Sequence, residues 1–408
     1  MSSGTMRPTD LLLASVLTGT GFLAAAGALA LAGELAGWGT AGWMALHLAL
    51  LGGVSQLVIG VSQFFVTAFL ATTPPPPKLV AAQTGCWSVG TVAVVTGVAG
   101  DVDPAVLAGS ALLLTTLGLY AAALSGLHRR SLQRAAWASR WYAASAAWLV
   151  PGIVAGVLLA TGVAWPYGSL LGAHLAFNLG GWLGGAIVGT LHTFFPSLTR
   201  TGLRFGRLQP LTFLLWSAGV GSLAIGYGAG EEPLVLAGWA LLLLASGSLS
   251  VNLVASAVAA PAGLTLPGRL VASAQVFLPL GVAFALLAAL EHPLAPLAGK
   301  DQGVLAVLLV VGWIGLTVAG SMLHLISVVV HVRDLGRGGP KKDSWRDRAV
   351  SWLAVAGVAL LSVARIADLD QLTGPALLLI FAAGLMILSS LLRSLVSAIR
   401  LGPGDRFG

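Results

Sequence analysis

The stretch HLAFNLGGWLGGAIVGTLH, from His174 to His192, carries a histidine at each end of a run that is otherwise mostly apolar and rich in glycine. It has the length of a membrane-spanning helix, which needs about 20 predominantly apolar residues. An α-helix turns by about 100° per residue, so two residues eighteen positions apart lie on the same face. The stretch therefore predicts a membrane helix with two imidazoles on one face.

The rest of the chain has the same apolar character. Of its 408 residues, 57% are hydrophobic and 9% are charged, whereas soluble globular domains carry about 25% charged residues. This composition predicts an all-α, polytopic membrane bundle in a single integral membrane domain over residues 1–408. The first run is too long for a signal-peptide core and is expected to be retained. The apolar runs number twelve, at about 11–33, 39–71, 79–99, 105–127, 141–163, 167–196, 208–228, 234–258, 268–290, 303–331, 349–367 and 374–398.

The basic residues predict the orientation of these runs in the membrane. With a cytoplasmic N-terminus, all of the 21 Lys and Arg residues except Lys300 and Arg365 fall in cytoplasmic segments. This asymmetry is the positive-inside bias of inner-membrane proteins. We therefore expect a multi-pass protein of the cytoplasmic (inner) membrane with both termini in the cytoplasm. The basic charge of the chain follows from this topology and indicates no nucleic-acid partner. The basic loops are expected to contact anionic lipids of the bilayer.

A glycine-rich motif recurs along the chain. GWLGGAIVG (residues 181–189) returns as GWIGLTVAG (residues 312–320), and GGVSQLVIG (residues 52–60) is a weaker copy. The copies fall in the second, sixth and tenth runs, four runs apart each time. Glycine allows membrane helices to approach one another closely. The spacing predicts three four-helix units around a pseudo-threefold axis, at about residues 1–130, 131–260 and 261–408.

Histidines are the side chains in the runs that are best suited to chemistry. His47 lies in the second run, His174 and His192 in the sixth, and His324 in the tenth. A buried polar group without a partner costs roughly 2–7 kcal/mol, so each imidazole is expected to have one. By depth, His47 and His174 form an outer pair, and His192 and His324 form an inner pair. Two imidazoles at equal depth can ligate a haem iron or contribute to a copper site.

Each of these residues also has a structural interpretation. A membrane histidine often serves only as a hydrogen-bonding residue between helices. Asn178, one turn from His174, either fixes the tautomer of that imidazole or holds two helices together. Likewise, the face that carries His174, Asn178, the glycines and His192 either lines a cofactor slot or forms a tight packing seam.

Other classes of chemistry lack the residues they need. Cys86 is the single cysteine, which excludes a disulfide within the chain and a thiolate metal site. We find no nucleophile–base–orienter set and no phosphate-binding loop. The sequence gives no indication of hydrolase or nucleotide chemistry.

Twelve helices in three arcs, with histidines on the second, sixth and tenth, resemble subunit I of the haem–copper oxidases. The stretches ALHLALLGGVSQLVIGVSQFF and Arg140 to Arg204 more closely resemble the membrane half of actinobacterial proteins fused to a multicopper-oxidase or nitrite-reductase-like domain. The resemblance implies an oxidase-like fold that binds haem or copper. It implies that His47 is a low-spin haem ligand and that His174 lies on the copper-side helix.

The chain departs from the oxidase pattern in several places. The oxidases carry a histidine pair on the seventh helix, where this chain has none, and His-x-His on the tenth, where it has His324 and His331. Leu305 stands at the repeat equivalent of His174. Acids and lysines for proton uptake are missing from the runs. We therefore do not expect a proton-pumping terminal oxidase.

The leading hypothesis is a haem- or copper-binding membrane protein in copper handling, nitrogen-oxide response or electron transfer. Its partners would be a periplasmic copper protein or an electron donor. Two alternatives stay open, namely a permease for a small molecule or metal ion that uses the histidines as its path, and a cofactor-free scaffold for a periplasmic copper protein. Whether the protein is an enzyme is left open.

Overall fold

The computed structural model describes residues 6–132, 137–261, 263–295, 299–334 and 343–401. Within these ranges the chain forms helices and no strands. Twelve helical segments are long and apolar enough to cross a membrane, so the predicted all-α, multi-pass architecture is confirmed. Helices are the expected solution because backbone groups in a bilayer find no water to bond with.

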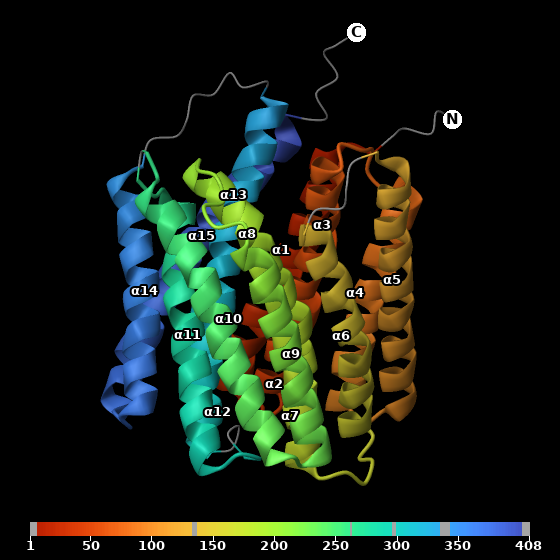
Figure 1. Cartoon of the computed structure of the whole chain (residues 1–408), viewed down its shortest axis with the longest axis vertical. Coiled ribbons are helices and arrows are strands. Elements are labelled where there is room, and N and C mark those ends of the chain that lie inside the picture. Colours follow the sequence, from red (N-terminus) through yellow and green to blue (C-terminus); the bar gives the residue numbers. More distant parts are fainter. Residues whose placement is uncertain (1–5, 133–136, 262, 296–298, 335–342, 402–408) are drawn as a thin grey trace. The chain divides into compact units, whose positions relative to one another are not determined.

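The helices fall into two compact units, residues 1–189 and 190–408. In each, long helices joined by short connections follow one another (Figure 1). The boundary lies inside α8, which belongs to both. Unit 1 contains α1 (Pro8–Ala36), α2 (Ala41–His47), η1 (Leu48–Val54), α3 (Ser55–Phe69), α4 (Pro77–Ala99), α5 (Asp103–Arg130), α6 (Trp137–Ala160), α7 (Tyr167–Leu175), η2 (Ala176–Gly184) and the first part of α8 (Gly185–Thr199).

Unit 2 continues from the second part of α8. Its remaining elements are α9 (Leu208–Ala229), α10 (Glu232–Val258), α11 (Leu266–Glu291), α12 (Gly299–Leu305), η3 (Ala306–Gly315), α13 (Leu316–Arg333), α14 (Trp345–Ile366), the 3₁₀ turn η4 (Asp370–Leu372) and α15 (Thr373–Arg400). The grouping into three four-helix units stays a prediction.

Three spans contain a wide π-helical segment, centred in the N-terminal half of the span. These segments are η1, η2 and η3, and each joins two α-helices into one continuous span. They occur in the second, sixth and tenth spans, the same three that carry the glycine-rich motif. π-Helical turns are rare and often mark functional sites. The recurrence distinguishes these three spans from the other nine candidate spans of the described chain.

In unit 1, buried indoles bind the η1 segment to its neighbours. Trp182 Nε1 donates to Ser55 Oγ at 2.8 Å, and that hydroxyl donates to the carbonyl of Leu50 at 2.9 Å. Trp87 Nε1 donates to the carbonyl of Leu51 at 2.8 Å. These bonds engage carbonyls of the irregular segment, where buried polar groups need partners.

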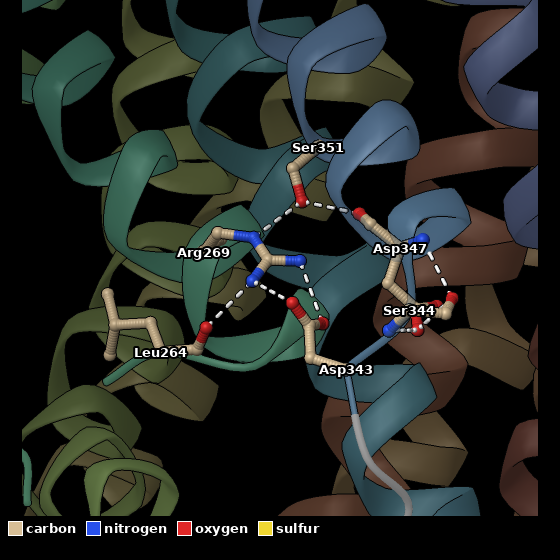
Figure 2. Close-up of polar contacts among 6 residues, drawn as sticks. All are labelled: Leu264, Arg269, Asp343, Ser344, Asp347 and Ser351. Carbon is tan, nitrogen blue, oxygen red and sulfur yellow. Dashed lines mark hydrogen bonds and ion pairs between the residues drawn. The ribbon is translucent and has the colours of Figure 1, made fainter. Parts of the chain in front are cut away.

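In unit 2, a polar cluster ties the start of α11 to the start of α14 (Figure 2). The Arg269 guanidinium donates to both carboxylate oxygens of Asp343, at 2.9 and 3.0 Å. It also donates to the Leu264 carbonyl and to Ser351 Oγ. Ser344 and Asp347 form a capping box at the start of α14. The residues that lead into α14 thus bond to the start of α11, while residues 335–342 lie outside the described ranges.

Candidate functional site

The site is built on a seam in unit 1 between α6 and the sixth span. Glycines of the sixth span face bulkier residues of α6. A Cβ at Gly181 would lie 2.5 Å from Trp148, one at Gly185 would lie 2.6 Å from Ser145 Oγ, and one at Gly189 would meet Trp141. These three glycines therefore form a tight packing seam. The sequence left open whether this face is a packing seam or a cofactor slot, and for these glycines it is a packing seam.

Toward the start of the sixth span, the glycines of the seam lie instead on α6. A Cβ at Gly156 would lie 3.0 Å from Cε1 of His174, and one at Gly152 would lie 2.7 Å from Nδ2 of Asn178. His174 and Asn178 thus occupy the space that α6 leaves by having glycine at these two positions. Gly152 and Gly156 thus form a cradle for this polar pair, and larger side chains at these two positions of α6 would not fit.

Hydrogen bonds fix the orientation of His174. Its Nδ1 lies 3.2 Å from the carbonyl oxygen of Gly152, which only accepts. Asn178 Nδ2 donates to the same carbonyl at 3.2 Å and to the His174 carbonyl at 2.7 Å. Since those two bonds use both amide hydrogens of Asn178, Nδ1 of His174 carries the ring hydrogen. Its Nε2 keeps a lone pair for a ligand.

His47 shows the same pattern at the end of α2. Its Nδ1 lies 2.9 Å from the carbonyl oxygen of Trp43, so Nδ1 is again the donor and Nε2 the free base. The ring stacks on the indole of Trp43, with centroids 4.0 Å apart and planes inclined by 30°. The side chain is partly buried. One hydrogen bond and a stacking partner leave the imidazole little freedom to turn.

His47 and His174 are brought together. They come from different spans of unit 1, and their side chains lie within electrostatic range of each other. Each is oriented through Nδ1 by a backbone carbonyl, which is the usual outer contact of a metal-bound histidine. The Nε2 atom of an imidazole is a common ligand of haem iron and of copper, so these two residues are the ones that could hold such a group.

The described residues contain no group of three or more His, Cys, Asp or Glu side chains placed to hold a metal ion. The candidate site consists of His47 and His174, with Asn178 hydrogen-bonded beside His174. Cys86 is a free thiol on α4 and is partly exposed.

The proposed inner pair lies in unit 2. His192 is fully buried on α8. His324, on α13, is partly buried and makes an edge contact with Phe194, with ring centroids 5.5 Å apart. Phe194 lies two residues beyond His192 in α8. A shared ligand of His192 and His324 stays a prediction.

The expectation that His174 and His192 share one helical face assumed a regular α-helix. The assumption is wrong, because residues 176–184 form the π-helical segment η2, whose wider turn advances each residue by a smaller angle. The two histidines also belong to different units.

Sequence reasoning missed Gly152, Gly156 and Trp43 as parts of the site. Gly152 and Gly156 form a small-xxx-small pair, which is a known signal for close helix approach. The sequence does not say which side chains fill the space that such glycines leave. Trp43 lies one turn before His47, a spacing that allows ring contact on a helix.

No protein-family model matches the chain, and no curated protein matches it in sequence.

Proposed function

We propose that this membrane protein binds haem or copper through His47 and His174, with Asn178 as a positioning residue. The observation that carries the proposal is the shared arrangement of the two imidazoles. Each has Nδ1 bonded to a backbone carbonyl, and the two side chains lie within electrostatic range of each other. A membrane histidine that serves only to join helices does not need a second, similarly oriented imidazole nearby.

The proposed role is copper handling, nitrogen-oxide response or electron transfer, with a periplasmic copper protein or an electron donor as partner. A haem iron or copper ion would supply one-electron chemistry or the binding of small ligands. The chain's own residues would hold the group, set its orientation and shield it from water. The proposal does not include proton pumping, since the 13 Asp and Glu residues in the described part of the chain lie at the ends of the spans or in the connections.

The proposed location is the inner membrane, with both termini in the cytoplasm. It is supported by the concentration of Lys and Arg on one side of the twelve spans. In this orientation His47 and His174 lie in the outer half of their spans, which is the side that a periplasmic partner would approach.

The first test is a visible absorption spectrum of the purified protein together with its iron and copper content. A sharp Soret band with stoichiometric iron supports haem, and stoichiometric copper without that band supports a copper site. A protein that contains neither after purification from a copper- and haem-replete host contradicts the proposal and favours the permease or the scaffold.

The second test uses His47→Ala and His174→Ala. Each is expected to remove most of the bound iron or copper, because neither imidazole alone provides the site. His128→Ala is a matched control, since His128 also bonds to a carbonyl four residues back through Nδ1, at 2.7 Å, but lies near the end of α5. If the two site variants retain the cofactor content of the control, the assignment is wrong.

A further inference from the structure

A second polar site lies in unit 1, between α3 and α4. Gln56 and Gln63 lie two turns apart on α3, and Gln83 lies on α4, next to Thr84. Each of the three glutamines is only 1% exposed. Three buried amides in an apolar span are costly unless their hydrogen-bonding groups are satisfied.

The protein satisfies only part of this cluster. Gln63 Nε2 donates to the Ile59 carbonyl at 3.0 Å and to Gln83 Oε1 at 2.9 Å. Gln56 Nε2 donates to Thr84 Oγ1 over a long 3.5 Å. Among the residues that the structure describes, Gln56 Oε1, Gln63 Oε1 and Gln83 Nε2 have no hydrogen-bond partner.

Exchanging the oxygen and NH₂ positions of Gln63 or Gln83 does not satisfy the unpartnered atoms. If Gln63 were turned over, its oxygen would face the carbonyl oxygen of Ile59. If Gln83 were turned over, its NH₂ group would face the NH₂ group of Gln63. Both arrangements oppose like groups. Gln63 and Gln83 thus leave one acceptor oxygen and one NH₂ group buried without a partner. Gln56 can turn over, because the Thr84 hydroxyl can donate as well as accept, but one end of its amide then still has no partner.

We propose that these three amides, together with Thr84, hold internal water in unit 1. Water is the smallest ligand that donates to the carbonyl oxygens and accepts from the NH₂ group. A buried water needs two to four polar partners, and the four side chains provide them. The inference does not depend on a cofactor at His47 and His174.

A buried glutamine of unit 2 provides a comparison, because its amide bonds only to protein groups. Gln275 Nε2 donates to the Val271 carbonyl and to Thr317 Oγ1, both at 3.0 Å. Its Oε1 accepts from Trp313 Nε1 at 3.1 Å. The protein thus engages both ends of this amide. The proposed water site thus lies in unit 1, which also holds His47 and His174. The amide of Gln275 in unit 2 is satisfied by protein groups alone.

The test is water-edited solid-state NMR on protein with ¹⁵N-labelled glutamine side chains in lipid bilayers. Gln63→Met, Gln83→Met and Gln275→Met assign the amide signals. Transfer of magnetisation from water to Gln83 Nε2 is expected to be several-fold faster than transfer to Gln275 Nε2. Equal, slow transfer to both amides in the wild-type protein would overturn the proposal.

The Gln63→Met variant tests whether the acceptor oxygen of Gln63 helps to hold the water. Transfer to Gln83 is expected to fall several-fold in this variant, because the water loses one partner. The Gln275→Met variant is the matched control and should leave transfer to Gln83 unchanged. Unchanged transfer in Gln63→Met would contradict the assignment of Gln63 to the site.

Discussion

Two glycines of α6 allow the polar pair of the candidate site to occupy its place. Gly156 lies against the ring of His174, and Gly152 lies against the amide of Asn178. Because the carbonyl of Gly152 also accepts from both side chains, this residue provides space and a hydrogen-bond acceptor. The cradle therefore depends on the absence of side chains on α6 as much as on the polar residues of the sixth span.

Gly156→Ala is expected to displace the His174 ring, because the new Cβ would lie 3.0 Å from Cε1. Overpacking of this kind costs roughly 1–3 kcal/mol, and bound cofactor should fall. The control is Gly118→Ala on α5, where a Cβ meets nothing within 4 Å and stability should rise by roughly 0.5–1 kcal/mol. Thermal unfolding and cofactor content measure both effects. If the Gly156→Ala protein binds as much cofactor and is as stable as the control, the claim that Gly156 makes room for His174 is wrong.

Asn178→Ala should weaken cofactor binding without abolishing it, since the imidazoles remain. Loss of a residue that orients a metal-bound histidine typically lowers affinity about 10–100-fold, and competition with a chelator measures the change. Asn252→Ala is a suitable control, because Asn252 is a buried asparagine that bonds to the backbone of Phe205 in unit 2. An affinity loss no larger than that of the control would mean that Asn178 only joins helices.

At the residue scale the sequence predicted the contact between His174 and Asn178, which is present in the structure. The assignment of His47 and His174 to a cofactor site stays a prediction. Ionisable groups in apolar spans are rare enough to be recognised by themselves. The partners Gly152 and Gly156 could not be predicted, because a contact between spans depends on which helices are neighbours. The unsatisfied ends of Gln56, Gln63 and Gln83 depend on side-chain geometry and could not be predicted either.

At the scale of elements, the π-helical segments are the feature that the sequence pattern hid. The repeated glycine motif identified the second, sixth and tenth spans as related, and the same three contain η1, η2 and η3. Hydrophobic periodicity does not reveal a local change from α to π geometry in a span that is apolar on every side. The predicted common face of His174 and His192 failed for this reason.

Trp182→Phe tests the link between the second and sixth spans. The change removes the indole N–H that donates to Ser55 Oγ at 2.8 Å, and it leaves an aromatic ring in a fully buried position. Loss of one buried hydrogen bond is expected to lower the free energy of unfolding by roughly 1–3 kcal/mol. Trp165→Phe, at a site that is 49% exposed, should have little effect. Equal unfolding temperatures for the two variants would show that the bond does not stabilise η1.

At the scale of the whole molecule, composition alone predicted the spans. All twelve predicted runs coincide with candidate spans of the structure, because length and hydrophobicity dominate the cost of placing a helix in a bilayer. The compact units fall at residues 1–189 and 190–408. Orientation in the membrane rests on the charge asymmetry of the connections.

The orientation predicts the behaviour of reporter fusions. A fluorescent protein that matures only in the cytoplasm should be active when fused after Arg400. An alkaline phosphatase that folds only outside the inner membrane should be active when fused in the connection near Lys300 and inactive after Arg400. The reverse pattern would place the termini outside and move the His47 and His174 pair to the cytoplasmic half.

X-ray absorption at the iron or copper edge of the purified, natively loaded protein tests the two-histidine site most directly. We expect scattering from two imidazole rings around the metal, which is lost in the His47→Ala and His174→Ala proteins and kept in His128→Ala. A loaded metal without imidazole scattering, or with imidazoles that both variants retain, would contradict this expectation.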